Sequence, residues 1–526
     1  MNTLNEVLRA STEAEPPMCD IEGYLTVVRD RRLPGLHALT ASGANAEEPK
    51  ERRLPPPEQP LLTRLDEMQA AELIERYIEF DKRDTDEPVH LHTPFVRHFV
   101  RRHDNQLPLV TGVTTLPLVL PDRSILSGRG LNRQYDIVLR VPEVLEALLP
   151  RAEDCTEAAI VAAMQLLTDE WFADAATDYP GKCMLISLAL SIIERVLLDQ
   201  RPAYFLSGGK RGVGKTTTIQ MISTAVLGRP AAAAAWSTSE EERRKALFSY
   251  LGEGVPLLVW DNIALGAAIS CPSIERALTS PTYQDRVLGV SETRTVPATT
   301  IQVFTGNNIT ARGDMASRTP QLRLAADRPD PENRPYKHAD PIGWTKDNRS
   351  QILAALFTLL LGNRRLHDPN PPPAETRFKT WYHLVGSAVE HAAKLHAEYA
   401  NGGVIDRRPD CPPSVISCRS LFLVAEGDEE QSSSLATVLD VLRTKWPDGC
   451  MASDVAAFAG LAEEAAVEFK AALETAAQKA IKVITATTIT WRLKALRDAP
   501  VQLTGGIYVL RYDAAHQGGS FVVKKL

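Results

Sequence analysis

The chain has 526 residues and a formal net charge of -7 at pH 7, and 44% of its residues are hydrophobic. Because domains average about 150 residues, this length predicts three or four domains rather than one core. The acidic balance excludes a protein that is basic throughout, so any contact with nucleic acid should be confined to a pore or to one small domain.

No segment has the character of a membrane anchor or an export signal. The longest apolar run, Cys183 to Ile193, is too short to span a bilayer and is typical of a buried helix. Residues 1–17 lack the basic and apolar regions of a secretory signal. The seven cysteines lie far apart, which favours reduced thiols over a metal site. We therefore expect a cytoplasmic protein with no membrane partner.

The first third of the chain shows three compositions in succession. Residues 1–60 are rich in proline and charge, which predicts a flexible or loosely ordered N-terminal segment. Residues 61–150 predict a small α+β subdomain, with a helical pattern over 67–80 and β-rich runs over 107–141. Residues 151–200 predict a helical subdomain that leads directly into the next strand.

A strand, a glycine-rich loop and an apolar helix follow one another over residues 202–227. This is the context that a phosphate-binding P-loop requires, since loop amides and the positive end of the helix would face the phosphates. Lys215 would reach the β and γ phosphates, and Thr216 would hold Mg²⁺. The residues predicted to contact ATP are Gly209, Lys210, Arg211, Gly212, Val213, Gly214, Lys215, Thr216 and Thr217.

Two later strands each end in polar residues. The apolar run 256–260 ends in Asp261, and a carboxylate at the carboxyl end of a buried parallel strand is expected to bind Mg²⁺ together with Thr216. The run 301–304 leads to Asn307, whose amide could orient the attacking water. The alternative reading of Asp261 is a residue that only caps the next turn.

Between these strands the sequence predicts a β-hairpin. Residues 286–290 and 296–300 would be its strands, with the tip at 291–294. Arg294 at that tip could follow the phosphate backbone of single-stranded DNA. The alternative is an ordinary solvated turn.

The C-terminal part predicts a helical linker region at 371–435 and a winged-helix domain at 436–526, made of three helices and a hairpin. From Trp491 onward the sequence contains six basic residues and two acidic residues. We expect Arg492 and Lys494, on the third helix, to contact duplex DNA. A protein contact through the same domain is the alternative. The charged residues in question are Arg492, Lys494, Arg497, Arg511, Lys524 and Lys525, against Asp498 and Asp513.

Four motifs resemble those of superfamily-3-like AAA+ replicative helicases of phages, plasmids and integrative elements, of the primase-associated type. The likeness extends from about residue 107 through the predicted winged-helix domain. It implies an AAA+ P-loop ATPase domain over 201–370, Asn307 as sensor, and Arg318 as the arginine finger that reaches the next subunit's ATP, with Arg312 as second choice. The alternative for Arg318 is a surface salt bridge. The motifs are Trp260-Asp261-Asn262, Asp285-Arg286-Val287-Leu288-Gly289, Thr305-Gly306-Asn307-Asn308 and Arg312-Gly313-Asp314-Met315-Ala316-Ser317-Arg318.

One position departs from the pattern of many AAA+ proteins. Asn262 stands where a glutamate base usually follows the Walker B aspartate. Either Asp261 doubles as the group that activates water, or a carboxylate from elsewhere does so. Both options suit phosphoryl transfer, in which positioning and charge stabilisation outweigh strong base catalysis.

The resemblance implies an ATP-dependent DNA helicase of a mobile element's replication system. Such an enzyme would be a ring of six subunits around single-stranded DNA, with a separate primase or other replication proteins as partners. The resemblance also implies that the hairpin over 286–300 projects into the pore of this ring. The alternative is a P-loop ATPase that acts as a loader, a switch or a defence or regulatory protein without unwinding DNA. ATPase stimulation by single strands and unwinding of a forked duplex distinguish the two.

Overall fold

The structure is a computed structural model. Contacts divide the chain into two compact units, Met1–Leu423 and Val424–Leu526, and each is described by itself. In the part of the chain that the structure describes, no helix is both long and apolar enough to cross a bilayer. The described residues are 19–21, 24–30, 60–77, 90–101, 107–208, 212–287, 292–307, 309–324, 336–364, 376–400, 426–477, 480–497, 501–503, 506–513 and 519–525.

A five-stranded parallel sheet forms the centre of the first unit, in the order β10-β11-β15-β9-β17. Its strands read as continuous apolar runs because both faces of the sheet are buried. The mixed α/β fold with a parallel sheet, expected from the sequence, is confirmed. The strands are β9 (Tyr204–Gly208), β10 (Ala232–Ala235), β11 (Leu257–Ile263), β15 (Ile301–Asn307) and β17 (Gln321–Leu324).

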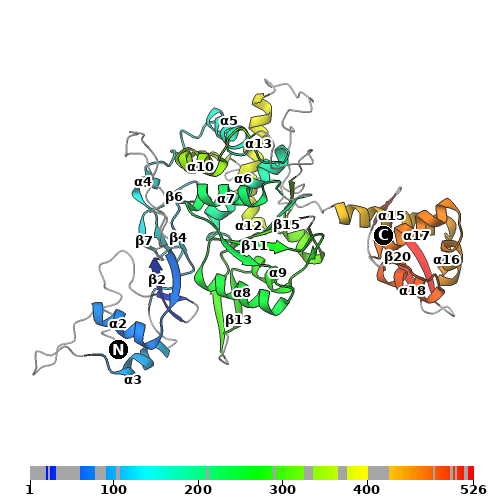
Figure 1. Ribbon diagram of the computed structural model, residues 1–526, viewed down its shortest axis with the longest axis horizontal. Coiled ribbons are helices and arrows are strands. Elements are labelled where there is room, and N and C mark those ends of the chain that lie inside the picture. Colours follow the sequence, from blue (N-terminus) through cyan, green and yellow to red (C-terminus); the bar gives the residue numbers. More distant parts are fainter. Residues whose placement is uncertain are drawn as a thin grey trace, which may run out of the picture. The chain divides into compact units, whose positions relative to one another are not determined.

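Helices cover both faces of this sheet (Figure 1). Tyr204 and Leu206 point to one face and pack with α6, α7 and α11, whereas Phe205 and Phe304 point to the other and pack with α8 and α9. The alternation follows from the two-residue period of a strand. These helices are α6 (Tyr179–Glu194), α7 (Lys215–Leu227), α8 (Glu240–Glu253), α9 (Pro272–Leu278) and α11 (Arg349–Leu361).

Further helices extend the layer that contains α6, α7 and α11. Trp381 and Ser191, 190 positions apart, are both buried and joined by a hydrogen bond of 2.7 Å from the indole nitrogen to the hydroxyl. The helices before the sheet and those after it therefore share one core. They are α4 (Glu143–Glu146), α5 (Glu157–Gln165), the π-helical turn η2 (Leu166–Trp171), α10 (Pro341–Asp347), α12 (Lys379–Trp381), the π-helical turn η6 (Tyr382–Gly386) and α13 (Ser387–Ala400).

The N-terminal part of this unit differs from the expectation of a loosely ordered segment over residues 1–60. Two strands lie within that range, β1 and β2, and β2 pairs with β3. They form because Ile21 and Leu25 bury their side chains. The elements here are β1 (Cys19–Ile21), β2 (Tyr24–Asp30), β3 (Pro60–Arg64), α2 (Glu67–Tyr77), α3 (Thr93–Arg101), β4 (Gly112–Thr114), β5 (Leu118–Val119), β6 (Ile125–Leu126), β7 (Arg129–Asn132) and β8 (Ile137–Arg140).

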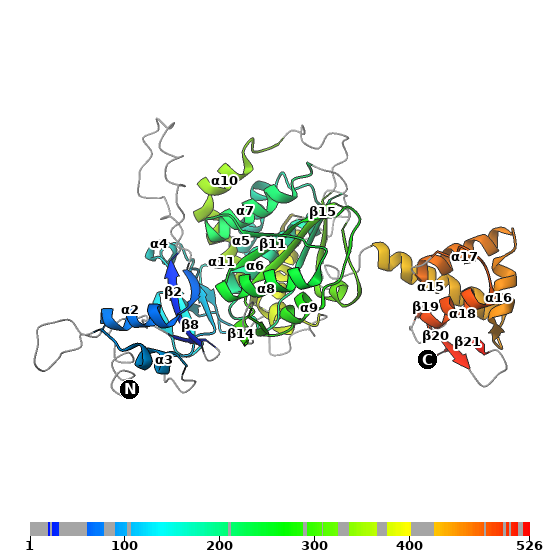
Figure 2. The ribbon, with the colours of Figure 1, turned by 60° about the horizontal axis from the view of Figure 1, so that its bottom comes forward.

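In the part of the second unit that the structure describes, there are four helices and an antiparallel sheet in the order β18-β21-β20-β19 (Figure 2). Its core contains Val438 from the first helix together with Phe469 and Leu493. That first helix begins within the range that the sequence assigned to a linker. The elements are α15 (Glu426–Lys445), β18 (Cys450–Met451), α16 (Ala452–Ala459), α17 (Glu464–Ala476), α18 (Ala486–Ala495), β19 (Val501–Leu503), β20 (Gly506–Asp513) and β21 (Ser520–Lys525).

Candidate nucleotide-binding site

The turn from β9 into α7 lies at the carboxyl edge of the parallel sheet. Gly212 and Gly214 have φ angles of 79° and 94°, which glycine adopts without a steric penalty. The N-cap residue of α7 is Gly214, which has no side chain that could cap the first amides, and this suits the binding of an anion at the positive end of the helix. Three predicted contact residues, Gly209, Lys210 and Arg211, lie outside the described residues.

Gly208, the last residue of β9, allows the lysine of the motif to fold back over the strand end. A Cβ at this position would lie 2.6 Å from Cγ2 of Val213 and 2.9 Å from Nζ of Lys215. Any larger residue would therefore displace the lysine. Sequence reasoning gave no role to Gly208, and the only signal for it is that it begins the glycine-rich loop.

Lys215 meets the predicted sensor residue. Its Nζ donates a hydrogen bond of 2.6 Å to Oδ1 of Asn307. The contact follows from the register of two parallel strands, in which Asn307 is the partner of Gly208. Burial lowers the pKa of Lys215, and the negative charge of Asp261 acts against that shift. Three of the predicted catalytic residues thus lie at the same strand ends.

Asp261 lies at the carboxyl end of β11, exposed to solvent. Its Oδ1 accepts a hydrogen bond of 2.6 Å from the hydroxyl of Thr305, a residue that sequence reasoning missed. Thr216 is exposed in the first turn of α7, whereas Val213 is buried. Among the described residues no three His, Cys, Asp or Glu side chains gather as metal ligands. One carboxylate and one hydroxyl fit Mg²⁺, which takes its remaining ligands from phosphates and water.

Asn262 occupies a bulge in β11. Its φ angle is 60°, and the pairing with β15 shifts between Trp260 and Ile263. Asparagine enters this left-handed region more readily than glutamate does, because its short side chain tolerates the conformation. The backbone thus gives a physical reason for the departure from the Asp-Glu pattern.

We expect Asn262→Glu to lower stability by about 1 kcal/mol, because glutamate is strained in the left-handed region. Asn262→Gly should leave stability close to that of the unmodified chain. Chemical denaturation of both variants measures the difference. A glutamate variant that is as stable as the glycine variant would contradict a backbone requirement at this position.

Arg318 lies far from Lys215 of its own chain. It ends the 3-10 helix η3 (Gly313–Arg318), and its carbonyl accepts a hydrogen bond from the amide of Ala203, just before β9 begins. Lys215 lies at the other end of β9, and five strand residues span roughly 16 Å. Arg318 therefore belongs to the amino edge of the sheet, and the P-loop to the carboxyl edge.

The guanidinium of Arg318 is bound within its own chain. It donates to the carbonyl oxygen of Glu275 at 2.7 Å and to Asp314 at 2.8 Å, and its side chain is 12% exposed. Arg312, the second choice, is exposed and follows β16 (Thr310–Ala311). A finger at Arg318 would have to release these contacts, whereas Arg312 already faces solvent.

The hairpin between α9 and β15 has different boundaries from those expected. Its strands are β13 (Thr282–Arg286) and β14 (Thr293–Pro297), and part of the tip lies outside the described residues. The register brings the buried side chains of Tyr283 and Val296 together, which fixes the strands earlier in the chain. Arg294 consequently lies within β14 opposite Asp285, and not at the tip.

The basic residues of α18 contact their own unit. Arg492 donates to the carbonyl oxygen of Ala480 at 3.1 Å, and Nζ of Lys494 lies 4.2 Å from the ring centre of Tyr512. Trp491 beside them is 68% exposed. Sequence reasoning missed this tryptophan, although an aromatic residue next to cations is a common feature of surfaces that bind nucleic acid.

Comparisons with known proteins add little to this geometry. No protein-family model and no curated protein matches the chain. Solved structures with some likeness are the JCV helicase (TM-score 0.23, 15% identity, 46% of this chain and 69% of that one), the inhibitor-bound JCV helicase (TM-score 0.23, 15% identity, 48% and 72%) and an apo form of the NrS-1 C-terminal region (TM-score 0.32, 8% identity, 89% and 94%). Similarity at these TM-scores carries no argument about function.

Proposed function

We propose that the chain is a DNA helicase that is powered by ATP hydrolysis at its own P-loop. The observation that carries the proposal is the meeting of Lys215, Asn307 and Asp261 at the positive end of α7. A cation, an amide and a carboxylate at this edge suit the binding and hydrolysis of a nucleoside triphosphate with Mg²⁺.

The residues divide the work by their chemistry. Lys215 would hold the β and γ phosphates, and Thr216 and Asp261 would hold Mg²⁺, which neutralises phosphate charge when bound. Asn307, now bonded to Lys215, would turn its amide to the attacking water once the lysine binds phosphate. Thr305 keeps the Asp261 carboxylate in place through its hydroxyl.

We further propose a ring of subunits, with Arg318 acting on the neighbour's nucleotide. The support is its place at the amino edge of the sheet, about the length of β9 away from its own P-loop. A guanidinium from a neighbour couples hydrolysis to docking, because it stabilises transition-state charge only when the subunits meet.

Contact with DNA is proposed for the second unit, read as a winged-helix domain. The exposed Trp491 and the excess of basic residues after it support this role. Single-stranded DNA would pass the hairpin of β13 and β14 in the pore.

Two assays on the full-length chain test the function. A helicase should hydrolyse ATP faster with single-stranded DNA and should unwind a forked duplex. A loader or switch would show ATP turnover without either response, and that result would replace the helicase proposal while leaving the P-loop ATPase intact.

We expect Arg492→Glu combined with Lys494→Glu to weaken duplex binding and to flatten its salt dependence, because two phosphate contacts are lost.

Trp491→Ala should weaken DNA binding by about 1–3 kcal/mol if a base stacks on the indole. Titration of a fluorescently labelled DNA measures both effects, because that signal does not depend on Trp491, the residue that the second variant removes.

Basal ATPase activity, which depends on the first unit, is the control for these variants. Unchanged DNA affinity at matched salt would identify the second unit as a protein-contact module.

A further inference from the structure

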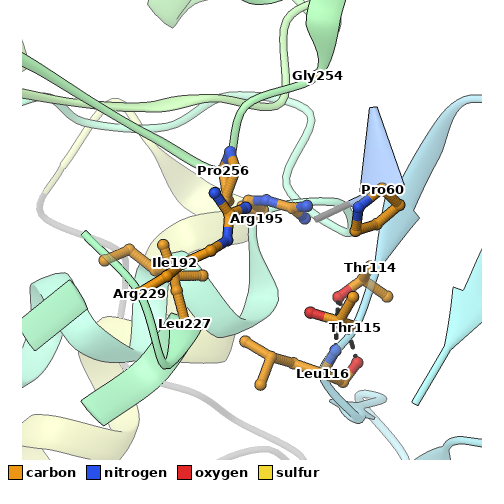
Figure 3. A pocket seen from close by; sticks show the side chains of 10 residues that line it. All are labelled: Pro60, Thr114, Thr115, Leu116, Ile192, Arg195, Leu227, Arg229, Gly254 and Pro256. Atoms are coloured by element: carbon orange, nitrogen blue, oxygen red, sulfur yellow. Dashed lines mark hydrogen bonds between the residues drawn. The ribbon is translucent and has the colours of Figure 1, made fainter. Parts of the chain in front are cut away.

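A small pocket lies at the amino edge of the parallel sheet, opposite the edge that holds the P-loop. Its wall comes from the ends of helices and strands that are distant in sequence (Figure 3). Pro256 immediately precedes β11, and Leu227 ends α7, so the pocket and Lys215 lie at opposite ends of the same elements. The lining residues are Pro60, Thr114, Thr115, Leu116, Ile192, Arg195, Leu227, Arg229, Gly254 and Pro256.

Two buried arginines meet in this pocket. Arg195 is 6% exposed and Arg229 is 9% exposed, and the labelled side chains lie close together below Pro256 (Figure 3). Nη2 of Arg195 donates to the carbonyl oxygen of Val113 at 2.6 Å. Its Nε and Nη1 are buried and make no hydrogen bond to any residue that the structure describes. Such donors are costly to leave unsatisfied.

No described carboxylate neutralises this pair. Burial lowers the pKa of Arg195 to about 9, and the positive charges of Arg229 and Arg201 add to that shift. Glu194 is next in sequence, but its carboxylate accepts from the amide of Val119, and burial raises its pKa to about 8. A guanidinium close to that carboxylate would instead lower its pKa.

The need for cations at the carboxyl end of α7 does not explain the burial of these two arginines either. The last carbonyls of α7 carry partial negative charge, which attracts cations. Arg349 already fills that role, because its Nε donates to Ala225 at 2.9 Å and its Nη2 to Val226 at 3.2 Å. The free donors of Arg195 are therefore not needed at this helix end, and Arg229 adds a second buried positive charge beside them.

We propose that this pocket binds one compact inorganic anion between Arg195 and Arg229, with the hydroxyl of Thr115 as a further donor. The hydroxyl of Thr114 is already bonded to Leu116, which leaves Thr115 on that wall. Paired guanidinium groups suit a phosphate-type oxyanion and also a halide. The site is separate from the P-loop and needs no part of the proposed ATPase function.

The test is the unfolding temperature of the full-length chain in inorganic phosphate, in chloride and in bulky gluconate at matched ionic strength. We expect phosphate or chloride to raise it by at least about 2 °C in a saturable manner, since an anion that binds only the folded state stabilises it. Arg195→Met and Arg229→Met should each remove that rise. In gluconate, Arg195→Met should unfold no lower than the unmodified chain, because the uncompensated charge is gone.

Two controls separate this site from other effects of salt. Arg133→Met changes an exposed arginine outside the pocket and should keep the full rise. Lys215→Ala should also keep it, which excludes phosphate bound at the P-loop. A rise with chloride alone assigns a halide, and a rise with phosphate alone assigns an oxyanion. Equal unfolding temperatures in all three salts, or the same rise in both methionine variants, would overturn the proposal.

Discussion

Lys215→Ala should abolish ATP turnover, with a loss of about 10²-fold or more, while the fold is retained. The side chain supplies a positive charge at the end of β9, where charge develops on the phosphates during transfer. Its removal deletes the hydrogen bond to Asn307, and Lys215 is not one of the buried residues of the hydrophobic core, so stability should change little. Steady-state release of phosphate and thermal unfolding measure the two quantities.

Lys245→Ala is the matched control for this variant. Lys245 lies on α8 and forms exposed ion pairs with Glu241 and Glu242, so its removal should leave turnover unchanged. A folded Lys215→Ala protein with near-normal turnover would remove the P-loop from the mechanism.

Arg318→Ala should cut turnover by about 10³-fold or more and leave nucleotide binding largely intact, if this residue acts as an arginine finger. Loss of a contact with nucleotide at the same chain's P-loop cannot explain such a decrease, because the length of β9 separates Arg318 from Lys215. Arg318→Lys keeps a charge but lacks the planar fork with which a guanidinium can bind two phosphate oxygens, so it should recover little activity. Arg364→Ala, at an exposed ion pair with Glu157, is the control.

Mixing two inactive variants tests whether Arg318 acts between subunits. A subunit with Arg318→Ala keeps a complete P-loop, and a subunit with Lys215→Ala keeps a complete finger. Mixed rings should therefore recover part of the lost activity. No recovery despite proven subunit exchange would count against Arg318 and would move the role to the exposed Arg312 or to a function within one chain.

Local features of the chain were predictable from the sequence because they depend on short-range chemistry. The glycines at 212 and 214 have the positive φ angles that the loop motif predicts, and Asp261 and Asn307 lie at strand ends as expected. The alternation of buried strands and helices likewise predicted a parallel sheet.

The tertiary structure decided what depends on contacts between distant segments. Strand register, and not spacing, brings Asn307 to Gly208 and so to Lys215. Because Tyr283 packs in the core, the hairpin strands lie earlier in the chain than the sequence predicted, and Arg294 lies within β14 instead of at the tip. Arg195 and Arg229 meet only because two helices end at one edge of the sheet. A sequence records the propensity of each segment, but the partners of a buried charge are set by the fold as a whole.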